Sequence, residues 1–216
     1  MVKEPTRAPD PRTDKTRMSL IEVGLKLGAR QGFEQTSVRQ IAETAGVNLA
    51  AINYHFGGKD GLREAIIDSI GCHMRERGPG FYLRELSPEQ IDEMSVAEAK
   101  AIMRKVMMVG VRSGGDSAMS GDMPQFMQRE IFSSGEHANH FFEKIFKTEH
   151  EMMCRLVSRV TGDEPDTDET KLRALTIIGQ SVFINIARSL VCATMNWDRL
   201  GDEELGTLET AFWVDA

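Results

Sequence analysis

Four residues in the second half of the chain, two histidines and two glutamates, have a spacing that can bind a divalent metal ion. They are Glu136, His137, His140 and Glu143, which share a helix face at i, i+3 and i+4 spacing. Such a face could serve a helical, metal-assisted enzyme, which we keep as the alternative function. The cluster follows a Ser-Ser-Gly turn, however, where a helix begins and exposed polar residues are expected. We therefore expect neither a metal ion nor a cofactor.

Other signatures of catalysis are missing from the sequence. It contains no nucleophile elbow, no glycine-rich loop that would cradle a phosphate and no H-E-x-x-H pair. The sequence therefore favours a function other than catalysis.

A second group of residues, between Ser37 and Lys59, has the types and spacing that DNA binding requires. Ser37 and Gln40 form an S-x-x-Q capping box that opens a short helix, and Gly46 ends it. Asn48 can cap the next short helix, which runs to Phe56. Two short helices joined by a tight Gly-Val turn outline a helix-turn-helix, in which the second helix enters the DNA major groove.

The second helix of this motif has an apolar side and a side that suits a groove lined with phosphates. Val47, Ile52 and Phe56 anchor the helix from beneath. The opposite side carries no acidic residue. We expect Leu49, Ala50, Asn53 and Tyr54 to point outward, and Lys59 at a helix N-terminus, His55 and the Tyr54 hydroxyl to bind phosphates.

This segment resembles the DNA-binding domain of the TetR/AcrR family of transcriptional regulators over roughly residues 15–65. The resemblance is carried by the T-S-V-R-x-I-A-x-x-A-G-V run from Thr36 to Val47 and by Y-H-F-x-x-K from Tyr54 to Lys59. The stretch 123–197 resembles a CecR-like C-terminal domain. The resemblance implies a homodimer, a palindromic double-stranded DNA operator, and repression that a small molecule relieves.

The resemblance also implies roles for single residues. Arg39 would reach a base from the first helix of the motif, and its chemistry suits guanine, whereas Asn53 suits adenine and Leu49 or Ala50 suits a thymine methyl. Two residues depart from the family pattern: Gly58 removes a side-chain cap, and Gly61 is expected to loosen the first turn that presents Lys59. The full set of candidate DNA-contacting residues is Ser37, Arg39, Asn48, Leu49, Ala50, Asn53, Tyr54, His55 and Lys59.

The elements that position these residues are predicted to be helices throughout. The fold class is all-α, with a three-helix helix-turn-helix domain at residues 15–60, a larger effector-binding and dimerisation domain at 61–216, and a flexible arm at 1–14. The arm carries Lys3, Arg7 and Arg12, and Lys15 and Arg17 follow it; these basic residues either enter a minor groove or are solvated. Helices are expected over 14–30, 37–45, 48–56, from 59 onward, and over 95–113, 123–132, 136–160, 168–196 and 202–213. Residues 78–93 are expected to form a loop or a broken turn.

Two of these helices, 136–160 and 168–196, are apolar over more than one stripe. Such a helix must bury both sides, so one side can pack on the chain's own core and the other on a second subunit around a two-fold axis. The alternative is that both helices are internal core. The candidate interface residues are Phe141, Ile145, Met152, Leu156, Ile178, Val182, Ile186 and Leu190.

Methionine and phenylalanine side chains of the same region could line an apolar ligand pocket, because flexible methionines adapt to a ligand. Plain hydrophobic core is again the alternative. The candidate pocket residues are Met103, Met107, Phe126, Arg129, Phe142, Phe146, Gln180 and Phe183.

The composition agrees with a regulator that has a DNA-binding head and an acidic body. The chain has 216 residues and a formal net charge of −7. Residues 1–70 are close to neutral, so the acidic excess lies in the rest of the chain. The three cysteines are dispersed and the N-terminal segment is polar, which favours a soluble cytoplasmic protein without a membrane partner.

Overall fold

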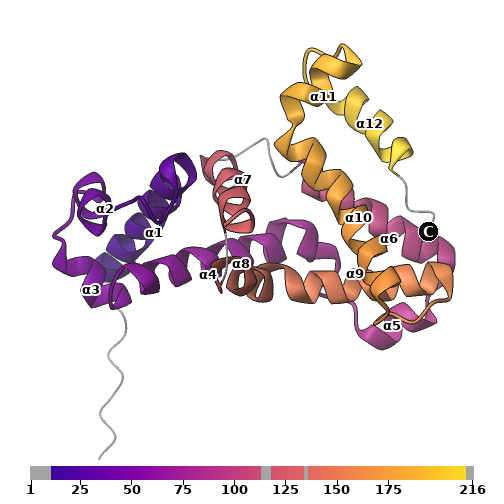
Figure 1. Ribbon diagram of the computed structural model, residues 1–216, viewed down its shortest axis with the longest axis horizontal. Coiled ribbons are helices and arrows are strands. Elements are labelled where there is room, and N and C mark those ends of the chain that lie inside the picture. Colours follow the sequence, from indigo (N-terminus) through magenta and orange to yellow (C-terminus); the bar gives the residue numbers. More distant parts are fainter. Residues whose placement is uncertain (1–10, 113–117, 134–135, 213–216) are drawn as a thin grey trace, which may run out of the picture. The chain divides into compact units, whose positions relative to one another are not determined.

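The computed structural model describes residues 11–112, 118–133 and 136–212, and every element in these ranges is a helix. The helices form two compact units: unit 1 comprises Met1–Ser69 and Asp122–Ser133, and unit 2 comprises Ile70–Gly121 and Ser134–Ala216. In chain order the elements are α1 (Pro11–Gln31), α2 (Val38–Ala45), α3 (Ala50–Phe56), α4 (Lys59–Arg77), the 3-10 helix η1 (Pro79–Tyr82), α5 (Pro88–Glu93), α6 (Val96–Arg112), α7 (Ala118–Ile131), α8 (Glu136–Phe141), the π-helical turn η2 (Phe142–Phe146), α9 (Lys147–Thr161), α10 (Asp168–Ile186), α11 (Arg188–Met195) and α12 (Asp202–Ala211) (Figure 1).

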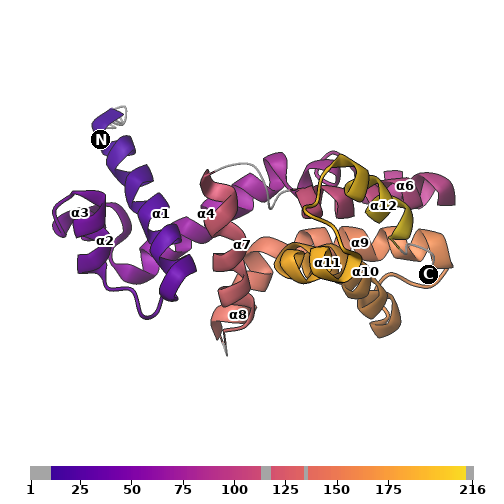
Figure 2. The same ribbon diagram turned by 90° about the horizontal axis from the view of Figure 1, so that it is seen from above.

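Unit 1 is organised around α1, which packs against both α2 and α3. Figure 2 shows these two short helices together beside α1. Each helix contributes fully buried aliphatic side chains, among them Leu20 of α1, Ile41 of α2, Ile52 of α3 and Leu62 of α4. The expected three-helix arrangement is therefore present, and burial of these side chains holds helices that would be too short to be stable alone.

Local signals set the ends of α2 and α3. The Ser37 hydroxyl accepts a hydrogen bond from the Gln40 backbone N–H at 3.1 Å, and Gly46 ends α2 with φ at 68°. The Asn48 side chain accepts from the Ala50 backbone N–H at 2.8 Å, although the N-cap position of α3 is occupied by Leu49 and not by Asn48 as predicted. The capping box at Ser37 is only half formed, because the Gln40 side chain bonds to Gln31 of α1 instead.

Helix α7 packs in unit 1, although it follows α6 in the chain. The Phe126 ring is buried and meets Phe33 edge to face, with the ring centroids 6.2 Å apart. The ring fits because residue 28 is glycine: a Cβ there would lie 2.7 Å from Phe126 Cε2. The units thus divide the chain differently from the sequence-based boundary at residue 60, since a helix from much further along the chain joins the first unit.

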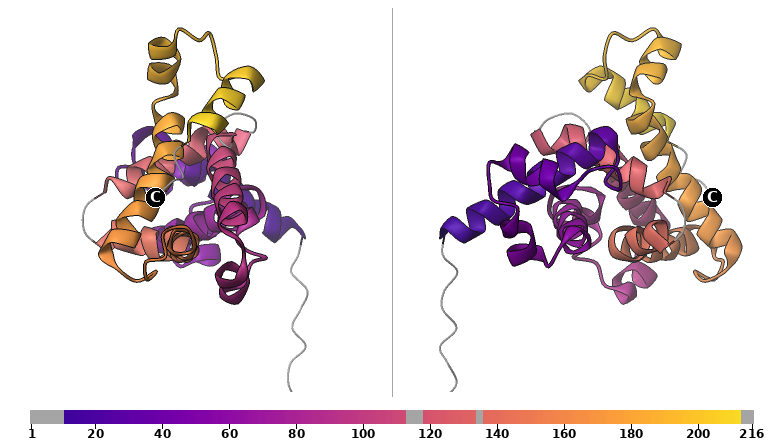
Figure 3. Two further views of the ribbon diagram at one scale, coloured as in Figure 1. Left: turned by 90° about the vertical axis from the view of Figure 1, so that its right-hand side faces the viewer. Right: turned by 60° about the vertical axis from the view of Figure 1, so that its left-hand side comes forward.

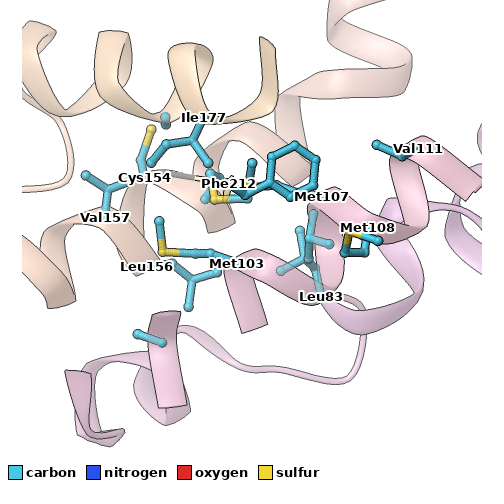
Figure 4. Packing of buried hydrophobic residues seen from close by; sticks show 14 of the residues in the cluster. Leu83, Met103, Met107, Met108, Val111, Cys154, Leu156, Val157, Ile177 and Phe212 are labelled. Carbon is cyan, nitrogen blue, oxygen red and sulfur yellow. The ribbon is translucent and has the colours of Figure 1, made fainter. Parts of the chain in front are cut away.

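The core of unit 2 lies where α6, α9 and α10 pack against one another. Figure 4 shows Met103 and Met107 of α6 close to Leu156 of α9 and Ile177 of α10, with Phe212 beside them. Met108 and Met153 are buried in the same cluster, so flexible thioether side chains form much of this core.

Two helices that the sequence predicts as continuous are interrupted. The predicted helix 136–160 contains the π-helical turn η2 between α8 and α9. The predicted helix 168–196 bends by 84° between α10 and α11. At the bend, Asn185 donates to the Gly110 carbonyl at 2.9 Å and Arg188 to the Val111 carbonyl at 2.8 Å, which caps the last turn of α6. Figure 3 shows α11 turning away from α10 and α12 returning toward α6.

The segment 78–93, predicted as a loop or a broken turn, contains η1 and α5. Helix α5 begins with a complete capping box, in which Ser87 Oγ accepts from the Gln90 backbone and the Gln90 side chain accepts from the Ser87 backbone. Pro88 stands at the first helical position, where its missing N–H costs nothing. The prediction of a loop or a broken turn is compatible with the single turn η1 but was wrong for α5, because the prolines and glycines were interpreted as turn signals and the capping box at Ser87 was not considered.

In the described part of the chain, no individual helix has the length and apolar character needed to cross a membrane. The bent pair α10–α11 meets both criteria only when the two helices are taken together.

Candidate nucleic-acid interface

The outward side of α3 is composed as the sequence predicts. Ile52 is buried, whereas Leu49, Ala50 and Asn53 are exposed. Tyr54 is 79% exposed, so its phenol is open to solvent. The helix therefore presents an amide, two small apolar groups and a phenol to solvent, with no carboxylate among them.

Helix α2, which packs against α3, carries an exposed arginine. Arg39 is exposed, and its Nε donates to Glu43 Oε1 at 2.8 Å. Ser37 is also exposed, although its hydroxyl already accepts the Gln40 N–H. The sequence prediction did not include Glu43, although its i, i+4 spacing from Arg39 was the signal that could have found it.

The start of α4 follows directly on the end of α3. His55 is half-buried, with its ring edge to face with Tyr54 at 5.0 Å. Lys59 is also half-buried, and its ammonium donates to the Glu34 carbonyl at 2.7 Å, so one of its three donors is already engaged. Arg17 of α1 lies over the Phe56 ring, 5.5 Å from its centroid.

Gly61 does not loosen the first turn of α4, contrary to the sequence-based expectation. A Cβ at this position would overlap the Phe56 carbonyl oxygen. Glycine lets the backbone of α4 pass directly over the last turn of α3. The turn that carries Lys59 is therefore closely packed against α3.

A buried ion pair joins α4 to α7 inside unit 1. Arg63 and Glu130 are 5% and 3% exposed, and Arg63 Nη2 lies 2.6 Å from Glu130 Oε2. Arg63 Nη1 reaches Glu34 Oε1, also at 2.6 Å. One arginine thus holds carboxylates from α7 and from the segment that precedes α2, and its buried charge is compensated.

The residues predicted to line a ligand pocket do not share one environment. Phe126 fills the gap at Gly28, and Arg129 donates from Nε and Nη2 to the Ala29 and Arg30 carbonyls, capping α1. In unit 2, the candidates Met103 and Met107 are buried in the core, Phe142 and Phe183 are exposed, and Phe146 and Gln180 are half-buried. Phe126 and Arg129 are thus engaged by α1, and their part in a ligand pocket stays a prediction.

The predicted interface residues fall into two groups. Phe141, Ile145 and Leu156 are buried within the chain, which leaves little of their surface for a partner, and their place in an interface stays a prediction. Met152 and Ile178 are half-buried, and Val182, Ile186 and Leu190 are exposed. The exposed members continue into three residues that the prediction left out of the interface: Leu172, Leu175 and Phe183, the last of which is 57% exposed.

Several candidates lie outside the described residues. The arm residues Lys3 and Arg7 do, as do the side chains of Arg12, Glu136 and His137. Lys15 is exposed on α1. Among the described residues, no group of three histidine, cysteine, aspartate or glutamate side chains could hold a metal ion.

Comparison with known proteins matches the two parts of the chain to two family models. Residues 20–66 match the model described as bacterial regulatory proteins of the tetR family. Residues 99–212 match the model of the C-terminal domain of the HTH-type transcriptional dual regulator CecR. The second match spans more than half of the chain.

Individual relatives agree with these models. The chain is 24% identical over 196 residues to the HTH-type transcriptional dual regulator CecR of Shigella flexneri, covering 88% of this chain and 85% of that protein. It is similar in fold to the crystal structure of AibR in complex with isovaleryl coenzyme A and operator DNA, with a TM-score of 0.62, 17% identity and coverage of 93% and 100%. A putative fatty acid metabolism regulator of Clostridium perfringens gives a TM-score of 0.60, 12% identity and coverage of 90% and 96%.

Proposed function

We propose that this chain is a homodimeric repressor. The premise is that it belongs to the TetR family of bacterial transcriptional regulators and has a C-terminal domain of the CecR type. It binds a palindromic operator in the cytoplasm and is released by a small, largely apolar ligand. Family membership itself establishes a DNA-binding regulator of transcription and not an enzyme. The alternative of a metal-assisted enzyme was wrong.

The observation that carries the proposal is the exposed side of α3, together with Arg39. Asn53 has the donor and acceptor needed to pair with adenine, and Arg39 has the paired donors that guanine accepts. Leu49 and Ala50 fit thymine methyl groups. Tyr54, through its exposed phenol, and Lys59, at the start of α4, are the proposed phosphate-binding residues.

A second copy of the chain is the proposed partner of α10 and α11. These helices expose an apolar surface that soluble proteins normally cover. Helix α11 has no buried residue at all in the isolated chain. A two-fold dimer is also what a palindromic operator requires, because each half-site binds one recognition helix. The residues of the surface are Leu172, Leu175, Val182, Phe183, Ile186 and Leu190.

The effector is proposed to act on unit 2, because its core is rich in methionine and can repack around an apolar group. AibR, which shares this fold, was crystallised in complex with isovaleryl coenzyme A and operator DNA, which makes an acyl chain a reasonable first ligand class to test. Helix α7 offers a route to the DNA-binding unit, since chain residues of unit 2 flank it on both sides. Its contacts with α1 and with Arg63 would change when α7 moves.

Fluorescence anisotropy with a labelled duplex enriched from a random pool tests the DNA-binding face. We expect Asn53→Ala to weaken binding by about 1–3 kcal/mol and to relax preference at one base pair. Tyr54→Ala should weaken binding to all sequences alike and leave the salt slope nearly unchanged, because a neutral phenol neutralises no phosphate. Glu209→Ala, exposed on α12, is the control and should bind as the wild type does. Unchanged binding by both α3 variants would contradict the proposal.

A further inference from the structure

The pair formed by Arg39 and Glu43 on α2 has a geometry that bears on base recognition. The Arg39 side chain is 80% exposed and the Glu43 side chain 65% exposed, with Nε 2.8 Å from Oε1. An exposed pair of this kind contributes little to stability. The pair therefore does little for the fold.

Glu43 is also poorly placed as a stabilising residue. It lies in the last turn of α2, where the helix dipole disfavours a negative charge, and that turn holds no basic residue. The order of the pair, arginine before glutamate, is the less favourable one on a helix. On a DNA-binding motif this carboxylate also faces the charge of the phosphates. The helix dipole, the order of the pair and the phosphate charge all disfavour a carboxylate at this position, and only the contact with Arg39 favours it.

That contact determines which edge of the guanidinium is available. A guanidinium can bind a base through the Nε and Nη2 edge or through the Nη1 and Nη2 end. Glu43 occupies Nε and leaves the end of the group free. We propose that Glu43 is a specificity-determining residue, which presents the Nη1 and Nη2 end of Arg39 to guanine O6 and N7. This inference rests on the proposed function, in which Arg39 reads a base.

The same pairing lowers binding to DNA of any sequence. The two charges cancel, so Arg39 adds no net attraction to phosphates while Glu43 holds it. Each phosphate that a protein neutralises adds about 0.9 to the slope of log affinity against log salt. An arginine released from Glu43 would bind phosphates wherever it met them. Glu43 thus favours the cognate base over the backbone.

The test compares four variants of the full chain by selection from a random duplex pool and by anisotropy at about 50 and 200 mM salt. For Glu43→Ala we expect a loss of guanine preference at one position of each half-site. We also expect a salt slope steeper by about 0.9 per subunit, and tighter binding to random duplex at the lower salt concentration. Glu43→Gln keeps an acceptor for Nε, so it should retain the guanine preference while its salt slope steepens. Arg39→Ala should lose the same guanine preference, and adding Glu43→Ala to it should cause no further change in preference.

Glu22→Ala provides the matched control, because Glu22 is an exposed acid on α1 of the same unit. It should leave the guanine preference intact. An unchanged base preference in Glu43→Ala would overturn the inference. So would a different base preference in the double variant than in Arg39→Ala alone, because Glu43 would then contact a base itself. If the wild-type protein enriches no sequence, the proposed function fails as well. If the wild type and Glu43→Ala enrich the same sequences, only this inference fails.

Discussion

Replacing Glu130 by glutamine tests whether the buried ion pair holds α7 in unit 1. The substitution keeps the size of the side chain and removes its charge, leaving Arg63 almost fully buried. Removing one partner of a buried pair costs about 3–5 kcal/mol. Here the amide oxygen still accepts from Arg63, and Glu34 remains 2.6 Å from Nη1. We therefore expect a loss of about 2 kcal/mol in the free energy of unfolding.

Circular dichroism during heating, which follows the loss of helix, measures this change. For a chain of this size, about 2 kcal/mol corresponds to a fall in Tm of about 4–8 °C. Glu169→Gln is the matched control, because Glu169 forms an exposed pair with Arg173 at 2.7 Å and should shift the Tm very little. The double variant Arg63→Met with Glu130→Leu should recover much of the loss. A Tm for Glu130→Gln equal to that of the control would refute the argument.

Three further predictions concern packing, titration and assembly. Gly61→Ala should destabilise the protein by about 1–3 kcal/mol, because the added Cβ would overlap the Phe56 carbonyl. The control Gly206→Ala lies in α12 with open space around it and should be neutral or stabilising. Equal melting temperatures of the two variants would contradict this prediction. Burial raises the pKa of the Glu149 carboxyl, so its contribution to stability is complete at low pH and is lost as the pH rises through the folded pKa. Glu149→Gln should therefore be more stable than the wild type at neutral pH, with a gain that disappears toward acidic pH; a gain of equal size at both ends of the range would be evidence against this. Phe183→Asp should convert a dimer to monomers in light scattering, and an unchanged mass would exclude this part of α10 from the interface.

The sequence was sufficient for the helix-turn-helix because its signals are local. Ser37, Gly46 and Asn48 act on backbone groups within a few residues, so their side chains and conformations follow from the sequence alone. The exposed side of α3 follows from the same periodicity, since burying Ile52 leaves its neighbours outside.

The sequence was insufficient where the partner of a side chain lies far along the chain. Arg129 binds a carbonyl one hundred residues earlier, and Phe126 fits a gap made by a glycine in α1, so neither role could be inferred from helix α7 itself. An apolar stripe also does not reveal which protein covers it. Phe141 and Phe183 have the same chemistry, yet the first is buried in its own chain and the second is exposed.

Selection of bound sequences from a random pool of DNA duplexes at fixed salt tests the central claim most directly. The account predicts an enriched inverted repeat, with a guanine and an adenine at fixed positions in each half for Arg39 and Asn53. A dimer would bind both halves at once. No enrichment by this chain, with no DNA binding even at low salt, would contradict the proposed function.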